Sequence, residues 1–307
     1  MFTPGEAYRC YPTADEVDGW LDRIWEQSET MPLTVTPVGR ALHIPATHMP
    51  YAATRLLRFE TPGRPAFYGV WHPPVSGPKP LMVFLPGYGA ELATLPCAAG
   101  HDLAYLSLEP MGYWTPDGQR EERRKEGNWP VLPDTAYSRG EDGYFQWLLN
   151  AALAVKWAWK QTAEVLPSRV SFFGTSQGGG TALLMGSLFA GRGTRCVMAD
   201  EPFLTDYPVA NFSGGAYDVL KWAFQQMPEE DFWHYVGLAD TLCHVHRLHM
   251  PVLLSEGGRD GVCPPATIRH LYERLPATKL LYHIDGRGHG HNPEFGRLAL
   301  TWADMYA

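Results

Sequence analysis

The sequence predicts an α/β fold in which a mostly parallel, twisted sheet carries helices on both faces. Short apolar runs that are typical of buried strands recur along the chain, among them "PLMVFLPGYG", "LAYLSL", "RVSFFG", "RCVMAD", "PVLLSEG" and "KLLYHIDG". Helical stretches such as "YFQWLLNAALAVKWAWKQTAEVL" lie between them. Strands that alternate with helices favour parallel pairing. Ligand chemistry is then expected at the carboxyl ends of the strands.

The N-terminal part is predicted to extend this fold. The stretch "TRLLRFETPGRPAFYGVWHPP" has two strand-like runs separated by a Pro-Gly turn, which indicates a hairpin. Before it, "DEVDGWLDRIWEQSE" predicts an amphipathic helix, because its apolar residues recur at helical intervals; these are Val17, Trp20, Leu21, Ile24 and Trp25. We expect residues 1–307 to form a single domain, with about the first 75 residues as a helical and hairpin extension.

Composition narrows the classes of partner. The 307 residues include 25 lysines and arginines against 33 aspartates and glutamates, a formal net charge of −8. This balance predicts no nucleic-acid or membrane partner and favours a small-molecule substrate. The N-terminal "MFTPGEAYRCYPTADEVDGW" carries acids where a signal peptide would be basic and apolar, and no apolar run could span a bilayer. The five scattered cysteines predict free thiols in a cytoplasmic protein.

A glycine-rich corner in "SFFGTSQGGGTALLMG" is the strongest functional signal. Gly174-Thr175-Ser176-Gln177-Gly178 fits the pattern GxSxG. It follows a predicted strand, Arg169 to Phe173, and precedes a predicted helix, Gly180 to Ala190. This is the setting of a nucleophile elbow, in which a strained turn exposes a reactive serine and the flanking glycines allow backbone segments to pass closely. Ser176 is therefore the predicted nucleophile.

An elbow serine needs a histidine to take its proton and a carboxylate to orient that histidine. In folds of this kind the acid and then the histidine follow the serine along the chain. Asp260 lies just past the predicted strand in "PVLLSEGGRDGVCPP", and His289 lies in the loop past the last predicted strand, in "LLYHIDGRGHGHNPEF". We predict these two residues as the orienting acid and the base.

Other residues compete for these roles. Asp240 precedes a predicted strand rather than following one, and Asp285 is close enough in sequence to His289 to cap the turn instead. His291 is separated from His289 only by Gly290, so the sequence leaves the choice between these histidines open.

Two backbone amides should stabilise the oxyanion of the tetrahedral intermediate. One is the amide after the nucleophile, which belongs to Gln177, and the other is expected from the turn after "LMVFLPGYG", at Tyr88. No metal site is predicted. The spacing in "HVHRLH" (His244, His246 and His249) matches no common ligand pattern.

Several blocks carry a resemblance to a known family. The blocks "GTSQGGG", "DEPFLTDY", "PVLLSEGGRDGVCPPATIRHLYERL" and "GHGHNPEF", and less specifically "WLDRIWEQSETMPL" and "YSRGEDGYFQWLLNAALAVKWA", are similar to segments of one family. It is the acetyl xylan esterase and cephalosporin C deacetylase family, also called carbohydrate esterase family seven. The resemblance implies an α/β-hydrolase that removes small acyl groups, chiefly acetyl, from sugars and other alcohols, without metal or cofactor.

Residue by residue, the resemblance implies that Ser176 is the nucleophile, Asp260 the orienting acid and His289 the base. It implies that the amides of Tyr88 and Gln177 form the oxyanion hole. It further implies a cytoplasmic homo-oligomer, since members of the family typically assemble as hexamers of paired trimers.

The chain departs from the family pattern at two places. Where the family has an Arg-Gly-Gln motif after the strand "LAYLSL", this chain has "EPMGYWTPDGQ", and where the family has glutamate after the catalytic histidine, this chain has Gly290. Two alternatives therefore stand beside a deacetylase. The first is a hydrolase for another substrate class, such as a peptide, a thioester or a larger acyl ester. The second is a binding protein on an inactive hydrolase fold.

Overall fold

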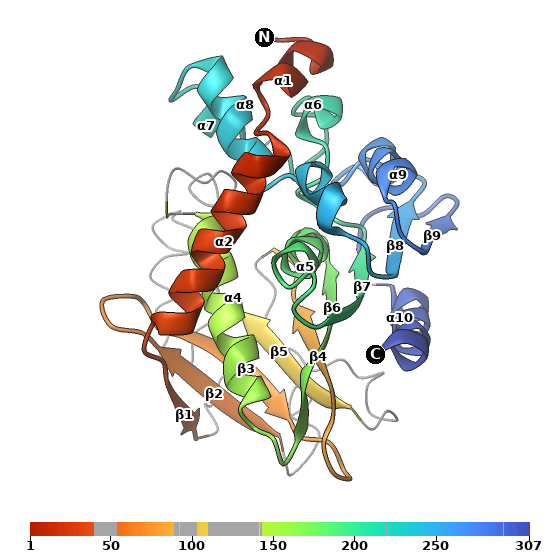
Figure 1. The fold of residues 1–307 in the computed structure, drawn as a ribbon. Helices are drawn as coiled ribbons and strands as arrows, with labels where there is room; N and C mark the ends of the chain where they lie inside the picture. The colour runs from red at the N-terminus through yellow and green to blue at the C-terminus, as the bar shows by residue number, and fades with distance from the viewer. Residues whose placement is uncertain are drawn as a thin grey trace.

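The computed structural model describes residues 1–39, 54–88, 92, 103–109, 141, 143–218, 220–290 and 292–307, and it contains a nine-stranded sheet in the order β1-β2-β3-β5-β4-β6-β7-β8-β9 (Figure 1). The strands are β1 (Thr34–Val38), β2 (Arg55–Glu60), β3 (Phe67–His72), β4 (Lys79–Leu85), β5 (Ala104–Glu109), β6 (Val165–Thr175), β7 (Thr194–Asp200), β8 (Val252–Gly257) and β9 (Lys279–Ile284). The helices are α1 (Pro4–Cys10), α2 (Ala14–Thr30), α4 (Tyr144–Trp159), α5 (Gln177–Leu188), α6 (Tyr207–Ala210), α7 (Leu220–Phe224), α8 (Glu229–Leu238), η3 (Thr241–Arg247), α9 (Pro265–Arg274) and α10 (Pro293–Tyr306).

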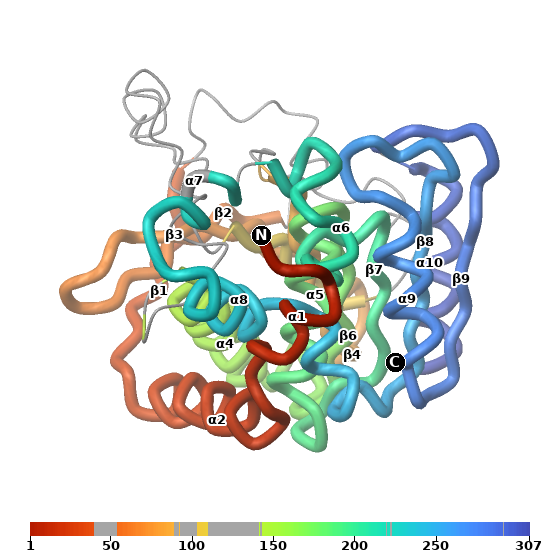
Figure 2. Tube along the Cα trace, turned by 90° about the horizontal axis from the view of Figure 1, so that it is seen from above, coloured from red at the N-terminus to blue at the C-terminus, as the bar shows by residue number. Residues whose placement is uncertain are grey.

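Strands β5, β4, β6, β7, β8 and β9 are mutually parallel, and β1, β2 and β3 extend the same sheet by antiparallel pairing. Seen from above, β8, β9, α9 and α10 lie along one side of the molecule and β1 to β3 along the other (Figure 2). The mostly parallel sheet confirms the fold class predicted from the sequence.

Alternating side chains divide the core between the two faces of the sheet. Val83, Phe172 and Val197 pack in a large buried cluster with residues of α2, α4 and α5. Their neighbours in sequence, Met82 and Phe173 among them, pack instead with α10. Successive residues of a strand point to opposite faces, so a strand buried on both faces must be apolar at almost every position. This is why the short apolar runs were recognisable in the sequence.

The predicted helix over residues 15–29 is α2, which begins at Ala14 and ends at Thr30. Its start is fixed by a capping box, in which the Thr13 side chain and the Glu16 side chain each accept a hydrogen bond from the other's backbone N–H. The predicted hairpin is formed by β2 and β3, with Arg55 paired to Trp71. Both predictions for the N-terminal part are confirmed at the level of these elements.

Two predicted boundaries were wrong. The long helix was expected to continue through "KQTAEVL", but α4 ends at Trp159 and β6 begins at Val165. Leu166 precedes Pro167, and the residue before a proline is disfavoured in helical conformation. The helix expected from Gly180 to Ala190 begins at Gln177 and ends at Leu188. Its glycine-rich first turn is helical because close packing there outweighs the low helical propensity of glycine.

Asp240 joins the N-terminal segment to the body of the protein. The side chain is fully buried, and its two oxygens accept four hydrogen bonds. Oδ1 accepts from the backbone N–H groups of Asp206 and Leu242, and Oδ2 accepts from the N–H of Tyr207 and the hydroxyl of Tyr11. A carboxylate has acceptors only, so all four donors are satisfied at once.

We predict that Asp240→Asn lowers the free energy of unfolding by about 2 to 3 kcal/mol, because the new amide NH₂ must face a buried donor. Urea unfolding followed by circular dichroism measures this change. Asp285→Asn makes the same chemical change at an exposed position and should leave the urea midpoint in place. Equal midpoints for the two variants would show that Asp240 does not hold the N-terminal segment.

Candidate active site

Four neighbouring strands bring the predicted site residues to one edge of the sheet. Strands β6, β7, β8 and β9 are adjacent and parallel, so their carboxyl ends lie side by side. Ser176 directly follows β6, Asp260 lies three residues after β8, and His289 lies in the loop after β9. Residues that are more than a hundred positions apart in sequence therefore meet in one place.

The backbone at Ser176 has the strained geometry of an elbow. Its φ of 57° lies in the left-handed region, which residues with a side chain rarely adopt. Three hydrogen bonds hold this conformation. The Ser176 N–H donates to the Asp200 carbonyl at 2.7 Å, and the Ser176 carbonyl accepts from the N–H groups of Phe203 at 2.9 Å and Gly180 at 3.0 Å.

Glycines at the elbow are required by the approach of other backbone segments. A Cβ on Gly178 would lie 1.9 Å from the Leu85 carbonyl oxygen at the end of β4. A Cβ on Gly174 would lie 2.0 Å from the Gly178 carbonyl oxygen. Because each obstacle is backbone, no change of rotamer could relieve the overlap. The glycines of the GxSxG pattern are thus required by the close packing of backbone segments at the elbow.

Ser176, His289 and Asp260 form a continuous line of hydrogen bonds. The Nε2 atom of His289 lies 3.0 Å from the Ser176 Oγ, and its Nδ1 atom lies 2.7 Å from Oδ2 of Asp260. The other oxygen of Asp260 accepts the backbone N–H groups of Val262 at 2.7 Å and Cys263 at 2.9 Å. These two bonds fix the carboxylate, which leaves Oδ2 to face the imidazole.

The surroundings of His289 favour its protonated form. Burial alone would lower the pKa of His289, but the hydrogen bond to Asp260 and the negative charges of Asp260, Glu201 and Asp200 outweigh burial. The net effect raises the pKa above the usual imidazole value. An imidazole that is stabilised in its charged form is suited to accept a proton from a nearby hydroxyl.

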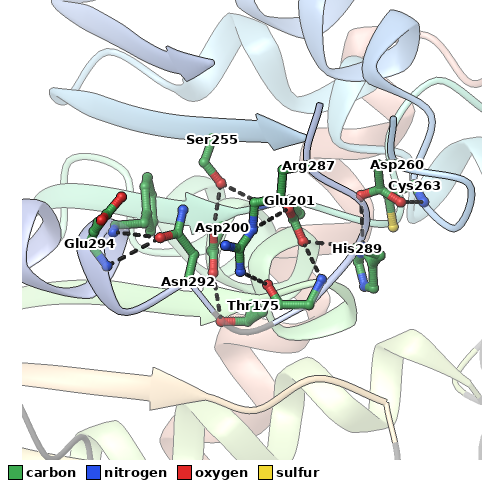
Figure 3. A network of polar contacts seen from close by, with 12 residues as sticks. Thr175, Asp200, Glu201, Ser255, Asp260, Cys263, Arg287, His289, Asn292 and Glu294 are labelled. Carbon is green, nitrogen blue, oxygen red and sulfur yellow. Dashed lines mark hydrogen bonds and ion pairs between the residues drawn. The ribbon is translucent and has the colours of Figure 1, made fainter. Parts of the chain in front are cut away.

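Behind the histidine lies a pair of buried acids, Asp200 and Glu201 (Figure 3). Oδ1 of Asp200 accepts a hydrogen bond from the Ser255 hydroxyl at 2.5 Å. Burial, and to a lesser degree the charge of Glu201, raise the pKa of Asp200 to about 7. Glu201 Oε2 accepts the Gly290 N–H at 2.8 Å, and Arg287 Nε lies 3.9 Å from Glu201 Oε1.

The two residues predicted as oxyanion donors, Gln177 and Tyr88, belong to the helix start at the elbow and to a turn that packs against it. Gln177 is the first residue of α5, where backbone N–H groups point out of the helix end. The turn that carries Tyr88 packs against the elbow, because a Cβ on Gly87 would lie 3.3 Å from the Thr175 carbonyl oxygen and 3.6 Å from the Ser176 Cβ. The neighbouring Gly89 lies outside the described residues.

The rival acids do not contact the histidine in the described part of the chain. Asp240 is engaged by Tyr11 and three backbone amides, and Asp285 is exposed in the turn after β9. His291, the rival histidine, and the segment that begins "PMGYWTPDGQ" lie outside the described residues.

The side chains of His244 and His246 in "HVHRLH" have partners within the protein. His244 bonds to the Ser187 hydroxyl and the Leu238 carbonyl oxygen, and His246 lies 2.9 Å from Asp18. Among the described residues, one group could offer three metal ligands, namely Asp260, Cys263 and His289, with ligand atoms within 4.8 Å of one another. Burial raises the pKa of the Cys263 thiol well above its usual range, although a hydrogen bond with Ser176 acts in the opposite direction.

Sequence reasoning missed two groups of the site, Glu201 and the Cys263 thiol. Glu201 directly follows the apolar strand "RCVMAD". Asp260 was singled out by a similar setting, just past the end of a predicted strand. The position of Glu201 after a strand could therefore have been noticed. It was not, because Asp260 already supplied the one acid that a triad of serine, histidine and acid requires.

The family model for acetyl xylan esterase (AXE1) matches residues 138–305, which is more than half of the chain. The chain belongs to the acetyl xylan esterase family. It is accordingly a serine ester hydrolase of the deacetylase type, as the sequence predicted. The match begins before α4, extends into α10 and includes Ser176, Asp260 and His289, whereas Tyr88 lies before it. A search of curated proteins found no match.

Solved structures with the same fold include two acetyl xylan esterases. The enzyme from Paenibacillus sp. R4 is 20% identical with a TM-score of 0.73, and the match covers 99% of each chain. Acetyl xylan esterase 1 from Thermoanaerobacterium sp. JW/SL YS485 is 20% identical with a TM-score of 0.72, and the match covers 94% of this chain and 93% of that one. The Pyrococcus horikoshii acylaminoacyl peptidase is 16% identical with a TM-score of 0.59 over 82% of this chain and 40% of its own.

We predict that Gly178→Ala destabilises the protein by about 3 kcal/mol or more, because the added methyl overlaps the β4 carbonyl. Thermal unfolding and ester hydrolysis should both report the loss. Gly19→Ala is the matched control, since a Cβ there meets nothing within 4 Å and alanine favours the helical conformation of α2. If Gly178→Ala were as stable and active as Gly19→Ala, close packing would not explain the glycine.

Proposed function

We propose that this esterase hydrolyses small acyl esters, chiefly acetyl groups on sugars or other alcohols, with Ser176 as nucleophile, His289 as base and Asp260 as the orienting acid. The observation that carries the proposal is the unbroken hydrogen-bonded line from Asp260 Oδ2 through both nitrogens of His289 to the Ser176 hydroxyl. Membership of the acetyl xylan esterase family supports the acyl group and the class of alcohol.

In the first half of the reaction Ser176 Oγ attacks the ester carbonyl carbon while His289 Nε2 takes the hydroxyl proton. The distance of 3.0 Å between these atoms suits a direct transfer. Asp260 accepts a hydrogen bond from Nδ1–H throughout, and because the proton stays on Nδ1, Nε2 is unprotonated until the attack occurs. The imidazolium that forms is stabilised by the same carboxylate.

The negative charge that develops on the carbonyl oxygen is stabilised by the amides of Gln177 and Tyr88 in this proposal. The imidazolium then donates its proton to the departing alcohol oxygen, which leaves an acyl ester on Ser176. In the second half, water takes the place of the alcohol, His289 removes its proton, and the carboxylic acid is released with Ser176 regenerated.

A cytoplasmic location and a homo-oligomeric state stay part of the proposal. The described cysteines, Cys10, Cys196, Cys243 and Cys263, are free thiols, which favours a reducing compartment. No helix in the described ranges is long and apolar enough to cross a membrane. The oligomer rests on the resemblance to a family of oligomeric enzymes.

We predict that wild type hydrolyses p-nitrophenyl acetate and that Ser176→Ala reduces kcat at least about 10³-fold, because no other group replaces the nucleophile. A fluorophosphonate should add to Ser176 in wild type, as located by mass spectrometry, and should label no residue in the variant.

The p-nitrophenyl octanoate ester provides the substrate control. A deacetylase should have a much lower kcat/KM for octanoate than for acetate. A preference for octanoate would favour a larger acyl substrate, and an unlabelled, inactive wild type would favour a binding protein.

We predict that kcat/KM falls on the acid side with a midpoint above about pH 6.5, the usual imidazole pKa. The direction follows from the charges around His289. They raise the pKa, so the neutral base is lost at a higher pH than for an isolated imidazole. Initial rates from pH 5 to pH 9 measure the midpoint, and a value below 6.5 would contradict the proposed environment of the base.

A further inference from the structure

The carboxylate of Glu201 contacts the same face of His289 as Asp260 does. Glu201 Oε2 lies 3.3 Å from His289 Nδ1, and Asp260 Oδ2 lies 2.7 Å from the same nitrogen. The Glu201 side chain is 1% exposed, so no bulk water screens it from the imidazole. Two acids from two different strands thus converge on one N–H (Figure 3).

Glu201 is held at this position at a conformational cost. It directly follows β7, and its φ of 44° lies in the left-handed region. Its N–H donates to the Ser255 hydroxyl at 2.9 Å, which fixes the backbone. On β8, Gly257 leaves the space that the carboxylate occupies, because a Cβ there would lie 3.1 Å from Glu201 Oε1.

The same oxygen that approaches the imidazole also holds the backbone beside it. Oε2 accepts the N–H of Gly290, the residue after the histidine, at 2.8 Å. Gly290 has a φ of 146°, which residues with a side chain rarely adopt. Glu201 therefore ties the loop of the base to the end of β7, and its Oε2 bridges the backbone and the imidazole of adjacent residues.

We propose that Glu201 is a second acid of the active site, a positioning residue that holds the His289 loop and supports the Nδ1 proton alongside Asp260. The inference rests on the proposed function of Ser176 and His289. In the resting geometry Asp260 is the hydrogen-bond acceptor, and Glu201 acts through its charge and through Gly290. When the carboxylate of Asp260 is removed, Glu201 can accept a hydrogen bond from Nδ1–H after a small movement of the ring.

Several charged or titratable groups act on His289 besides Glu201. From β8 and its loop come Asp260 and Cys263, from β7 comes Asp200, and Arg287 of the histidine's own loop lies near the Glu201 carboxylate. Burial raises the pKa of Glu201, so the acid is charged only above its own raised pKa. The charge of Glu201 must therefore be tested through the pH at which His289 titrates. The variants used for this must leave Asp260, Cys263, Asp200 and Arg287 in place.

The first arm of the test is Glu201→Gln. The amide oxygen of glutamine can still accept from Gly290, so this variant removes the charge and keeps an acceptor. We expect the acid midpoint of kcat/KM to fall by about 0.5 to 1 pH unit and kcat to fall by less than about tenfold, because Asp260 still orients the imidazole. Because the stability of a variant depends on pH, circular dichroism at each pH of the profile checks that the midpoint reports on the folded enzyme.

Glu256→Gln is the matched control. Glu256 is also a buried glutamate at the end of a strand, but it pairs with Arg269 and His283. Its replacement should leave the acid midpoint at the wild-type value. A midpoint in Glu201→Gln equal to that of wild type would overturn the proposal, as would an equal shift in both variants.

The second arm compares Asp260→Ala with Asp260→Ala/Glu201→Gln, using p-nitrophenyl acetate. Loss of the only acid of a triad lowers kcat by about 10⁴-fold. We expect the single variant to retain at least about tenfold more activity than the double variant, since Glu201 then accepts the hydrogen bond from Nδ1–H. Equal residual rates in the two variants, at temperatures where both are folded by circular dichroism, would overturn this role.

Ser176→Ala, assayed in parallel, distinguishes a failure of the proposed function from a failure of the proposed role of Glu201. If Ser176→Ala keeps wild-type activity, the proposed function and the second acid both fail. If Ser176→Ala is inactive and fluorophosphonate labels Ser176 in wild type, the proposed function stands, and the Glu201 variants alone decide the inference.

Discussion

The hydrogen bond between His289 and Ser176 is the contact that the sheet and its loops must hold in place for the site to function. It joins residues 113 positions apart and spans only 3.0 Å. Neither loop could hold such a distance alone, because loops at the surface are more mobile than the elements they connect. The precision comes from the parallel register of β6 to β9, which brings the ends of all four strands to one edge. The buried cores on both faces keep that register, since a slip by one residue would exchange the apolar residues between the faces.

Strain is concentrated at the same edge. Ser176 and Glu201, which follow neighbouring strands, both have positive φ angles. Each is held by hydrogen bonds from the adjacent strand or loop, as with the Ser176 N–H to Asp200 and the Glu201 N–H to Ser255. A strained residue persists only where its surroundings fix it on several sides. For Ser176, the dense packing around the glycines of the elbow fixes the strained backbone. For Glu201, the absence of a side chain at Gly257 leaves room for the carboxylate.

The sequence was sufficient for the fold and for the three groups in the hydrogen-bonded line, and the reasons are physical. Buried parallel strands must be apolar on both faces, so they stand out as short runs, and each ends where a polar residue begins. That rule singled out Asp260 and the loop that carries His289, with His291 as a rival, and the GxSxG pattern singled out Ser176. The rule could not locate the end of α4 or the start of α5, because those boundaries depend on Pro167 and on packing around Gly178. Nor could it rank the adjacent acids Asp200 and Glu201, because Glu201 reaches the histidine through a left-handed backbone conformation that the tertiary structure imposes.

The glycine after His289, Gly290, and the buried acid Glu201 are linked by a hydrogen bond. The family that the sequence resembles has glutamate at the position after the histidine, and this chain has glycine there with a φ of 146°. A Cβ at Gly290 would meet nothing within 4 Å, so space does not require glycine, but the backbone conformation does. In that conformation the Gly290 N–H reaches the Glu201 carboxylate. In this chain the carboxylate beside the base comes from the end of β7, and the backbone N–H of Gly290 binds it.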